Sequence, residues 1–119
     1  MLTSNDLYNL RKNLDNNDLI IIKFTADWCM PCKSIANVCK EHVEKLPKSI
    51  SFYEINIEES LELYMFLKNK KQVSGLPTLL AFNKLLDEDV HFYLPKFSSV
   101  GGNTNNVNIF FDSCLKYVN

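Results

Sequence analysis

The sequence has little of what marks fibrous, secreted or membrane-spanning chains. Only three glycines and four prolines occur among its 119 residues, which excludes a fibre or a long linker. Its longest uninterrupted aliphatic run covers only residues 19–22 and is too short to cross a bilayer. Residues 1–6 contain neither a basic region nor an apolar stretch, so we expect no signal peptide. These absences predict a cytoplasmic protein that makes no membrane contact.

The chain also lacks an excess of charge of either sign. Its net charge is −1, and no basic face is forced by composition, so nucleic acid is not an expected partner. Hydrophobic residues make up 46% of the sequence and charged residues 23%, as in ordinary globular proteins that bury a core. The length predicts one domain over residues 1–119, and we expect a monomer.

Hydrophobic periodicity predicts alternating helices and strands. Helices are expected over residues 5–16, 30–46 and 58–69, and from a cap at Thr104 or Asn105 onward. Strands are expected over residues 19–24, 50–57 and 78–82, with one more within 90–94 or 97–100. Helical connections predict that the first three strands run parallel, and the direct connection predicts that the last two are antiparallel. The expected fold class is α/β, with a four-stranded mixed sheet flanked by about four helices.

Only two of the four cysteines have an informative spacing. Cys29 and Cys32 form a C-x-x-C pair that follows a buried strand and opens a helix. A thiolate at a helix N-terminus is stabilised by unpaired N–H groups, so its pKa falls and it becomes a better nucleophile. We expect Cys29 to lie at the exposed start as the nucleophile. We expect Cys32, one turn inside, to attack the resulting mixed disulfide and release the product.

A zinc site is the alternative interpretation, because Cys29, Cys32, Cys39 and His42 offer four ligands. A continuous helix over residues 30–46 would separate Cys32 from Cys39 by roughly 10 Å along its axis. A tetrahedral zinc site with bonds of about 2.3 Å does not bridge that separation, so we expect no metal, and the zinc interpretation survives only if the predicted helix is not continuous. Cys39 and Cys114 fall on apolar helical faces and are predicted to be small buried hydrophobes.

Three segments resemble the thioredoxin family, in the family's order. Residues 24–33, FTADWCMPCK, are similar to its active-site segment. Residues 74–82, SGLPTLLAF, resemble its cis-proline segment, and residues 100–101 match a glycine position on its substrate-binding rim. The resemblance implies a single thioredoxin-like domain. Its first strand would be short or absent, because only residues 1–4 precede the first expected helix.

The resemblance also implies a function and a set of site residues. It implies a thiol–disulfide oxidoreductase that reduces protein disulfides and needs no bound cofactor, since the cysteines carry the electrons. An external reductase or small thiol would restore the dithiol. The bond before Pro77 is implied to be cis. The implied substrate surface comprises Trp28, Met30, Pro31, Leu76, Pro77 and Gly101. Two alternatives stay open: a disulfide-forming oxidase or isomerase with the same cysteines, and a non-catalytic adaptor.

The sequence departs from the family pattern at several positions. The family usually has a buried Asp where Lys23 stands and a Lys where Glu54 stands. If both side chains point beneath Cys32, we expect them to form an internal ion pair, since either charge alone would be costly there. We hypothesise that Glu54 relays the proton of the resolving step. For Lys23, a side chain that reaches outward to solvent is the alternative to a buried one. Met30 replaces a usual glycine, and its soft side chain is expected to widen substrate contact.

The connection over residues 83–99 is longer than the usual hairpin connection of the family. Its acidic cluster, residues 87–89, is expected to be a solvated turn.

Overall fold

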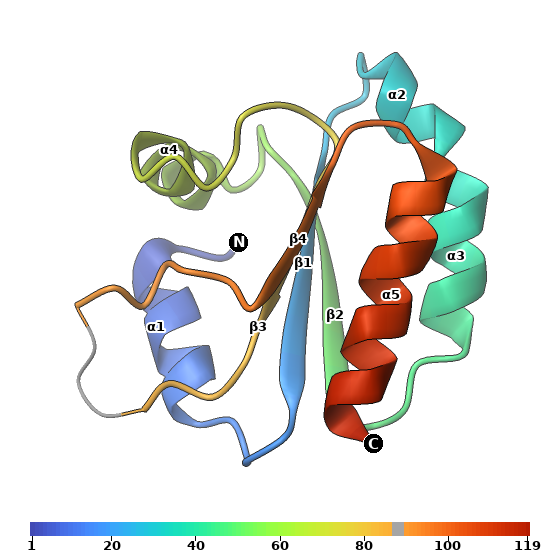
Figure 1. The fold of residues 1–119 in the computed structure, drawn as a ribbon. Coiled ribbons are helices and arrows are strands. Elements are labelled where there is room, and N and C mark those ends of the chain that lie inside the picture. Colours follow the sequence, from blue (N-terminus) through green and yellow to red (C-terminus); the bar gives the residue numbers. More distant parts are fainter. Residues whose placement is uncertain (87–89) are drawn as a thin grey trace.

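Four strands form one mixed sheet in the order β2-β1-β3-β4. They are β1 (Leu19–Thr25), β2 (Ile50–Asn56), β3 (Thr78–Phe82) and β4 (Phe97–Val100). The computed structural model describes residues 1–86 and 90–119, and in it the sheet lies between two layers of helices (Figure 1). One layer holds α1 (Ser4–Lys12) and α4 (Leu61–Asn69), and the other holds α2 (Met30–Ser34), α3 (Ala36–Glu44) and α5 (Thr104–Val118). The predicted α/β class is confirmed.

The centre of the sheet is β1, and its side chains supply the core on both faces. Because successive side chains of a strand point to opposite faces, Ile20, Ile22 and Phe24 pack into the cluster under α1 and α4. Leu19 and Ile21 pack into the cluster under α3 and α5. This two-sided burial explains why the strand reads as a continuous apolar run.

The prediction that the first three strands run parallel is wrong at the third. β1 and β2 are parallel, but β3 runs antiparallel to β1. Phe24 near the end of β1 pairs with Thr78 at the start of β3. Figure 1 shows α4 end-on, lying across the sheet instead of back along the strands. Residues 70–77 therefore return the chain to the end of the sheet that it has just left. The predicted antiparallel pairing of β3 with β4 is confirmed.

Several helix boundaries differ from the predicted ones. The helix expected over residues 30–46 is broken at Ile35, which is fully buried, so α2 and α3 are separate helices. The last helix is capped by Asn103, whose side chain accepts the N–H of Asn106, and not by Thr104 or Asn105. Periodicity alone missed the break, because the apolar positions keep helical spacing across it.

The first element of the fold is the helix α1. Thr3 caps α1, and its side chain and that of Asp6 accept each other's backbone N–H groups. Within residues 1–86, no strand precedes Leu19, as expected for a short or absent first strand. β2 is consequently an edge strand of the sheet. No helix in the described part of the chain is long and apolar enough to cross a membrane.

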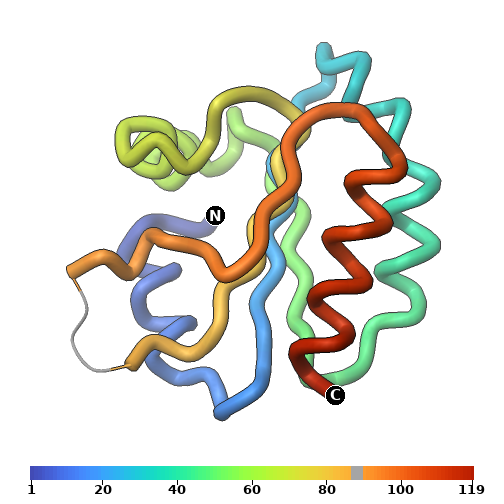
Figure 2. The backbone as a smooth tube through the Cα atoms, viewed as in Figure 1, coloured from blue at the N-terminus to red at the C-terminus, as the bar shows by residue number. Residues whose placement is uncertain are grey.

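The long connection between β3 and β4 returns beside α1 (Figure 2). The buried guanidinium group of Arg11 donates to the carbonyl oxygen of Phe92 at 2.6 Å. The Phe92 ring meets the ring of Tyr8 edge-on, with 5.3 Å between centroids. The strand expected within residues 90–94 or 97–100 is β4 (Phe97–Val100). The acidic cluster that was expected to form a solvated turn, residues 87–89, lies outside the described part of the chain.

Candidate active site

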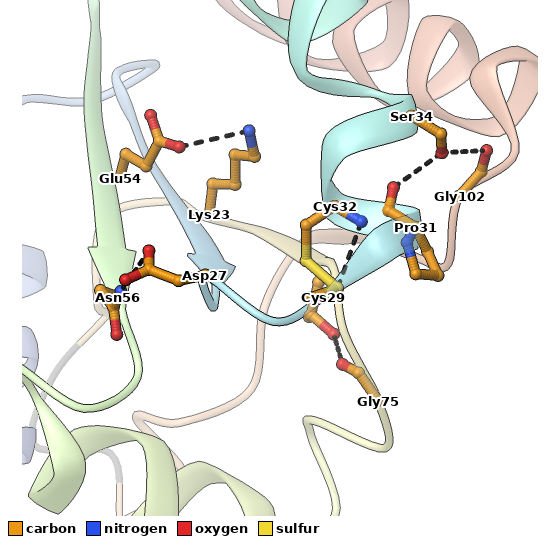
Figure 3. Close-up of a disulfide and its surroundings, with 11 residues drawn as sticks. Lys23, Asp27, Cys29, Pro31, Cys32, Ser34, Glu54, Asn56, Gly75 and Gly102 are labelled. Carbon is orange, nitrogen blue, oxygen red and sulfur yellow. Dashed lines mark hydrogen bonds and ion pairs between the residues drawn. A yellow bond between two sulfur atoms is a disulfide. The ribbon is translucent and has the colours of Figure 1, made fainter.

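Cys29 and Cys32 are joined by a disulfide at the start of α2 (Figure 3), with their Cα atoms 5.3 Å apart. Cys29 is the N-cap residue of this helix, and its Sγ accepts the backbone N–H of Cys32 at 3.2 Å. Pro31 lies in the first turn, where a missing N–H leaves no partner unsatisfied. The predicted placement of the pair at a helix N-terminus is therefore confirmed.

Exposure does not distinguish the two cysteines. Each is only 3% exposed, so the expectation that Cys29 lies at an exposed start is wrong for this disulfide-bonded form. The exposed residues are its neighbours, since Trp28 is 65% and Met30 69% exposed. The two sulfur atoms differ in hydrogen bonding. The Sγ of Cys29 accepts the backbone N–H of Cys32, which has no carbonyl partner because it lies at the start of a helix.

Two further segments meet at the site, and both match the segments singled out in the sequence. The Leu76–Pro77 peptide bond is cis, as the resemblance implies. The carbonyl oxygen of Pro77 accepts the N–H of Gly101 at 2.9 Å, which joins this segment to the β4–α5 turn. Gly101 has a φ of +95°, a conformation that favours glycine.

The β4–α5 turn also packs against α2, and the sequence analysis missed this contact. The hydroxyl group of Ser34 donates to Pro31 O at 2.8 Å and reaches Gly102 O at 3.4 Å. A Cβ atom at Gly102 would lie only 3.1 Å from the Cβ of Pro31. The two consecutive glycines, Gly101 and Gly102, were visible in the sequence, but only the fold shows that Gly102 faces Pro31 and Ser34.

Lys23 and Glu54 are paired, but only one of them is internal. They are register partners on β1 and β2, and Lys23 Nζ lies 3.4 Å from Glu54 Oε1 (Figure 3). The Lys23 side chain is 4% exposed, whereas that of Glu54 is 55% exposed because it lies on the edge strand. The expectation of an internal pair is therefore wrong for Glu54. Both residues line one surface hollow together with Cys32 and Asp27.

The other two cysteines are buried in the core, as predicted. Cys39 is 2% exposed and Cys114 is fully buried, and both are free thiols. Burial raises the pKa of the Cys114 thiol to about 12 and also raises that of Cys39. For Cys39 the charge of Lys23 acts in the opposite direction, and burial outweighs it.

The alternative zinc interpretation finds no geometric support in the described residues. The sulfur atoms of Cys29 and Cys32 are bonded to each other. His42 stacks on the ring of Phe111, with 4.5 Å between centroids, and its Nε2 lies 2.7 Å from Oδ1 of Asn108. No group of three or more His, Cys, Asp or Glu side chains in residues 1–86 and 90–119 is arranged to hold a metal ion.

A sequence profile of the thioredoxin family matches residues 3–91. The chain belongs to the thioredoxin family. It is 35% identical over 75 residues to thioredoxin H-type 2 of Nicotiana tabacum, an alignment that covers 54% of this chain and 63% of that protein. It is 36% identical over 64 residues to thioredoxin-1 of Saccharomyces cerevisiae, covering 54% and 57%. The matched segments thus span less than two thirds of the length of these curated relatives.

Solved thioredoxin structures share the fold over nearly the whole chain. The reduced thioredoxin pre-protein of Schistosoma mansoni superposes with a TM-score of 0.66 at 26% identity, covering 98% of this chain and 94% of that one. A Plasmodium falciparum thioredoxin gives a TM-score of 0.67 at 18% identity, covering 95% of each chain. The fold therefore extends beyond the matched profile, through β4 and α5.

Proposed function

We propose that this protein is a thiol–disulfide oxidoreductase that reduces disulfides in other proteins. The observation that carries the proposal is the Cys29–Cys32 pair at the capped start of α2. The backbone N–H of Cys32 points at the Cys29 sulfur, so it would stabilise a thiolate there once the pair is reduced. Cys29 is therefore the nucleophile of the proposed cycle.

The cycle consists of two thiol–disulfide exchanges. The Cys29 thiolate attacks one sulfur of a substrate disulfide, forms a mixed disulfide and releases the first substrate thiolate. The Cys32 thiolate then attacks Sγ of Cys29, the bond to the substrate breaks, and the second substrate thiolate leaves. Two electrons have passed to the substrate, and the protein holds the Cys29–Cys32 disulfide seen in this structure.

The proposed substrate surface surrounds this disulfide. Trp28 and Met30 supply exposed apolar side chains beside the cysteines. Leu76, Pro77 and Gly101 belong to the two segments that meet there, and Pro31 holds the start of α2. An extended protein segment is the substrate that this arrangement favours, because Leu76 can offer its backbone groups to another chain.

Glu54 remains the candidate proton relay for the resolving step. It lines the same hollow as Cys32, and its exposed carboxylate can exchange a proton with water. It would accept the proton of the Cys32 thiol before the mixed disulfide is resolved.

No bound cofactor is needed in this cycle, because the two cysteines carry the electrons. A reductase or small thiol must return two electrons to the Cys29–Cys32 disulfide after each turnover. We propose that the protein acts as a monomer in a reducing compartment such as the cytoplasm, where such donors keep dithiols reduced.

The first test is the reduction potential of the Cys29–Cys32 couple, measured in a dithiol or glutathione buffer and followed by the fluorescence of the only tryptophan, Trp28. A potential near −270 mV supports a reductant, and one between about −180 and −120 mV indicates an isomerase or oxidase instead. Absence of a reversible two-electron couple would contradict every redox function, and partner binding that survives Cys29→Ser would then indicate an adaptor.

A further inference from the structure

We propose that the buried ammonium group of Lys23 favours the thiolate form of Cys32 in the reduced protein and so speeds release of the substrate. This inference rests on the proposed function, because it assigns Lys23 to the resolving step of the same cycle. Lys23 is a positioning residue here: it touches no substrate and acts through Cys32.

Lys23 and Glu54 are unequally buried. The lysine side chain is 4% exposed and the glutamate side chain 55%. Water screens an exposed carboxylate, whereas a buried ammonium acts through a medium of lower dielectric constant. The pair therefore leaves a net positive field inside the protein, although its formal charge is zero.

The buried charge of Lys23 lies close to Cys32 in the fold. Lys23 on β1 and Cys32 on α2 line one surface hollow beside the disulfide. In Figure 3 the Lys23 side chain reaches toward Glu54. The same pair acts on Cys39, where burial raises the pKa most, the charge of Lys23 lowers it, and the charge of Glu54, the smallest of the three causes, raises it.

The other charged groups that line this hollow are exposed, so we expect each of them to act on Cys32 more weakly than Lys23 does. Asp27, Lys33 and Glu54 line the same hollow, but all three are exposed and their charges are screened. Residues 72–78, around the cis-proline, contain no charged side chain, and neither do residues 98–106 around the β4–α5 turn. Lys23 is the buried charge among the groups that line this hollow.

The chemical consequence falls on the second exchange. Cys32 must lose its proton, which the proposed relay Glu54 would accept, before its sulfur can bond to Sγ of Cys29. An opposite charge nearby favours the ionised form of a thiol, so a larger fraction of Cys32 is thiolate at neutral pH. The same effect stabilises the reduced state and makes the couple more oxidising than it would be without Lys23.

The test isolates Cys32 in a Cys29→Ser background and follows its ionisation by NMR of cysteines labelled with ¹³C at Cβ. Replacing Lys23 by Met keeps an unbranched side chain that is one atom shorter and removes the charge. We expect Lys23→Met to raise the titration midpoint of Cys32 by about one pH unit. Lys23→Arg keeps the charge and should restore a low midpoint, which a merely structural role would not predict.

Lys23→Gln provides a second neutral variant in case Lys23→Met fails to fold, and the two free core cysteines serve as internal reference signals. A midpoint that stays the same or falls in a folded neutral variant would overturn the inference. The proposed function is tested separately, since the midpoint is measured in a protein that lacks Cys29 and performs no turnover. An inactive parent protein with a midpoint that depends on Lys23 would sink the function and leave the electrostatic result standing.

Discussion

The two pairs of cysteines in this protein are almost equally buried but differ in their surroundings. Cys29 and Cys32 are each 3% exposed, Cys39 is 2% exposed and Cys114 is fully covered. The first pair lies at a helix start, beside exposed apolar residues and a hollow with charged walls. The second pair lies on helix faces turned toward the core. Burial alone therefore does not distinguish the proposed redox pair from the other two cysteines.

The two pairs of cysteines differ in whether a backbone N–H group is available to donate to the sulfur. Inside a helix each N–H is already bonded to the carbonyl group four residues earlier, so a mid-helix thiolate finds no free donor. At the start of α2 the N–H of Cys32 has no helical carbonyl partner and donates to the Cys29 sulfur. Burial raises the pKa of Cys114, whereas a donor aimed at the sulfur would favour a thiolate on Cys29 once the disulfide is reduced.

The largest expected effect on activity comes from substituting one cysteine of each pair and comparing the two variants. Cys29→Ser should reduce the turnover of a disulfide-bonded protein to the uncatalysed rate, because it removes the nucleophile. Cys114→Ala should keep full activity and lose about 1 kcal/mol of stability, because it removes only a buried sulfur. Reductant-coupled disulfide reduction and urea unfolding measure the two outcomes. Activity in Cys29→Ser would contradict its assignment as the nucleophile.

The next effect separates the roles within the active pair. Cys32→Ser should retain the first exchange and lose the second, so mixed disulfides with substrate proteins accumulate through Cys29. Non-reducing electrophoresis and mass spectrometry of the linked peptides detect them. The double variant Cys29→Ser/Cys32→Ser is the matched control and should trap nothing. Trapping through Cys39 or Cys114 would break the distinction between the two pairs.

The sequence was sufficient where structure depends on neighbouring residues. The apolar runs predicted β1 and β3 closely, and the C-x-x-C motif with its proline predicted the helix start at Cys29. The cis bond before Pro77 followed from the resemblance of one short segment. These features are local, so a single stretch of sequence carries their signal.

Features that depend on contacts between distant segments could not be predicted from the sequence. The direction of β3 depends on how α4 lies across the sheet, which no pattern within α4 specifies. The unequal burial of Lys23 and Glu54 depends on strand order. Lys23 lies on the central strand between β2 and β3, whereas Glu54 lies on the edge. The sequence placed two opposite charges near Cys32 but did not distinguish the covered one from the exposed one.

A smaller effect is expected at Glu54. If it relays the proton of Cys32, Glu54→Gln should slow the resolving step in single-turnover kinetics. We expect roughly a tenfold loss, below the usual range for a general base, because water in the open hollow can partly replace the carboxylate. Glu41→Gln, on the exposed side of α3, is the matched control. Unchanged kinetics in Glu54→Gln would leave this residue only as the ionic partner of Lys23.

The smallest expected effect is a pH dependence of stability that arises from the inert pair. Burial raises the pKa of Cys114 from 9.0 to about 12, so above pH 9 the unfolded chain loses a proton that the folded protein keeps. The stability contributed by the protonated thiol is complete below pH 9 and is lost as the pH rises toward 12. The free energy of unfolding should therefore fall by about 1 kcal/mol more in the parent than in Cys114→Ala between about pH 8 and about pH 10. Urea unfolding of the oxidised proteins measures this difference, since the Cys29–Cys32 disulfide does not titrate and Cys39 is common to both. Parallel pH profiles would mean that Cys114 ionises in the folded protein as easily as in the unfolded chain, and the contrast between the two pairs would then not lie in their thiol chemistry.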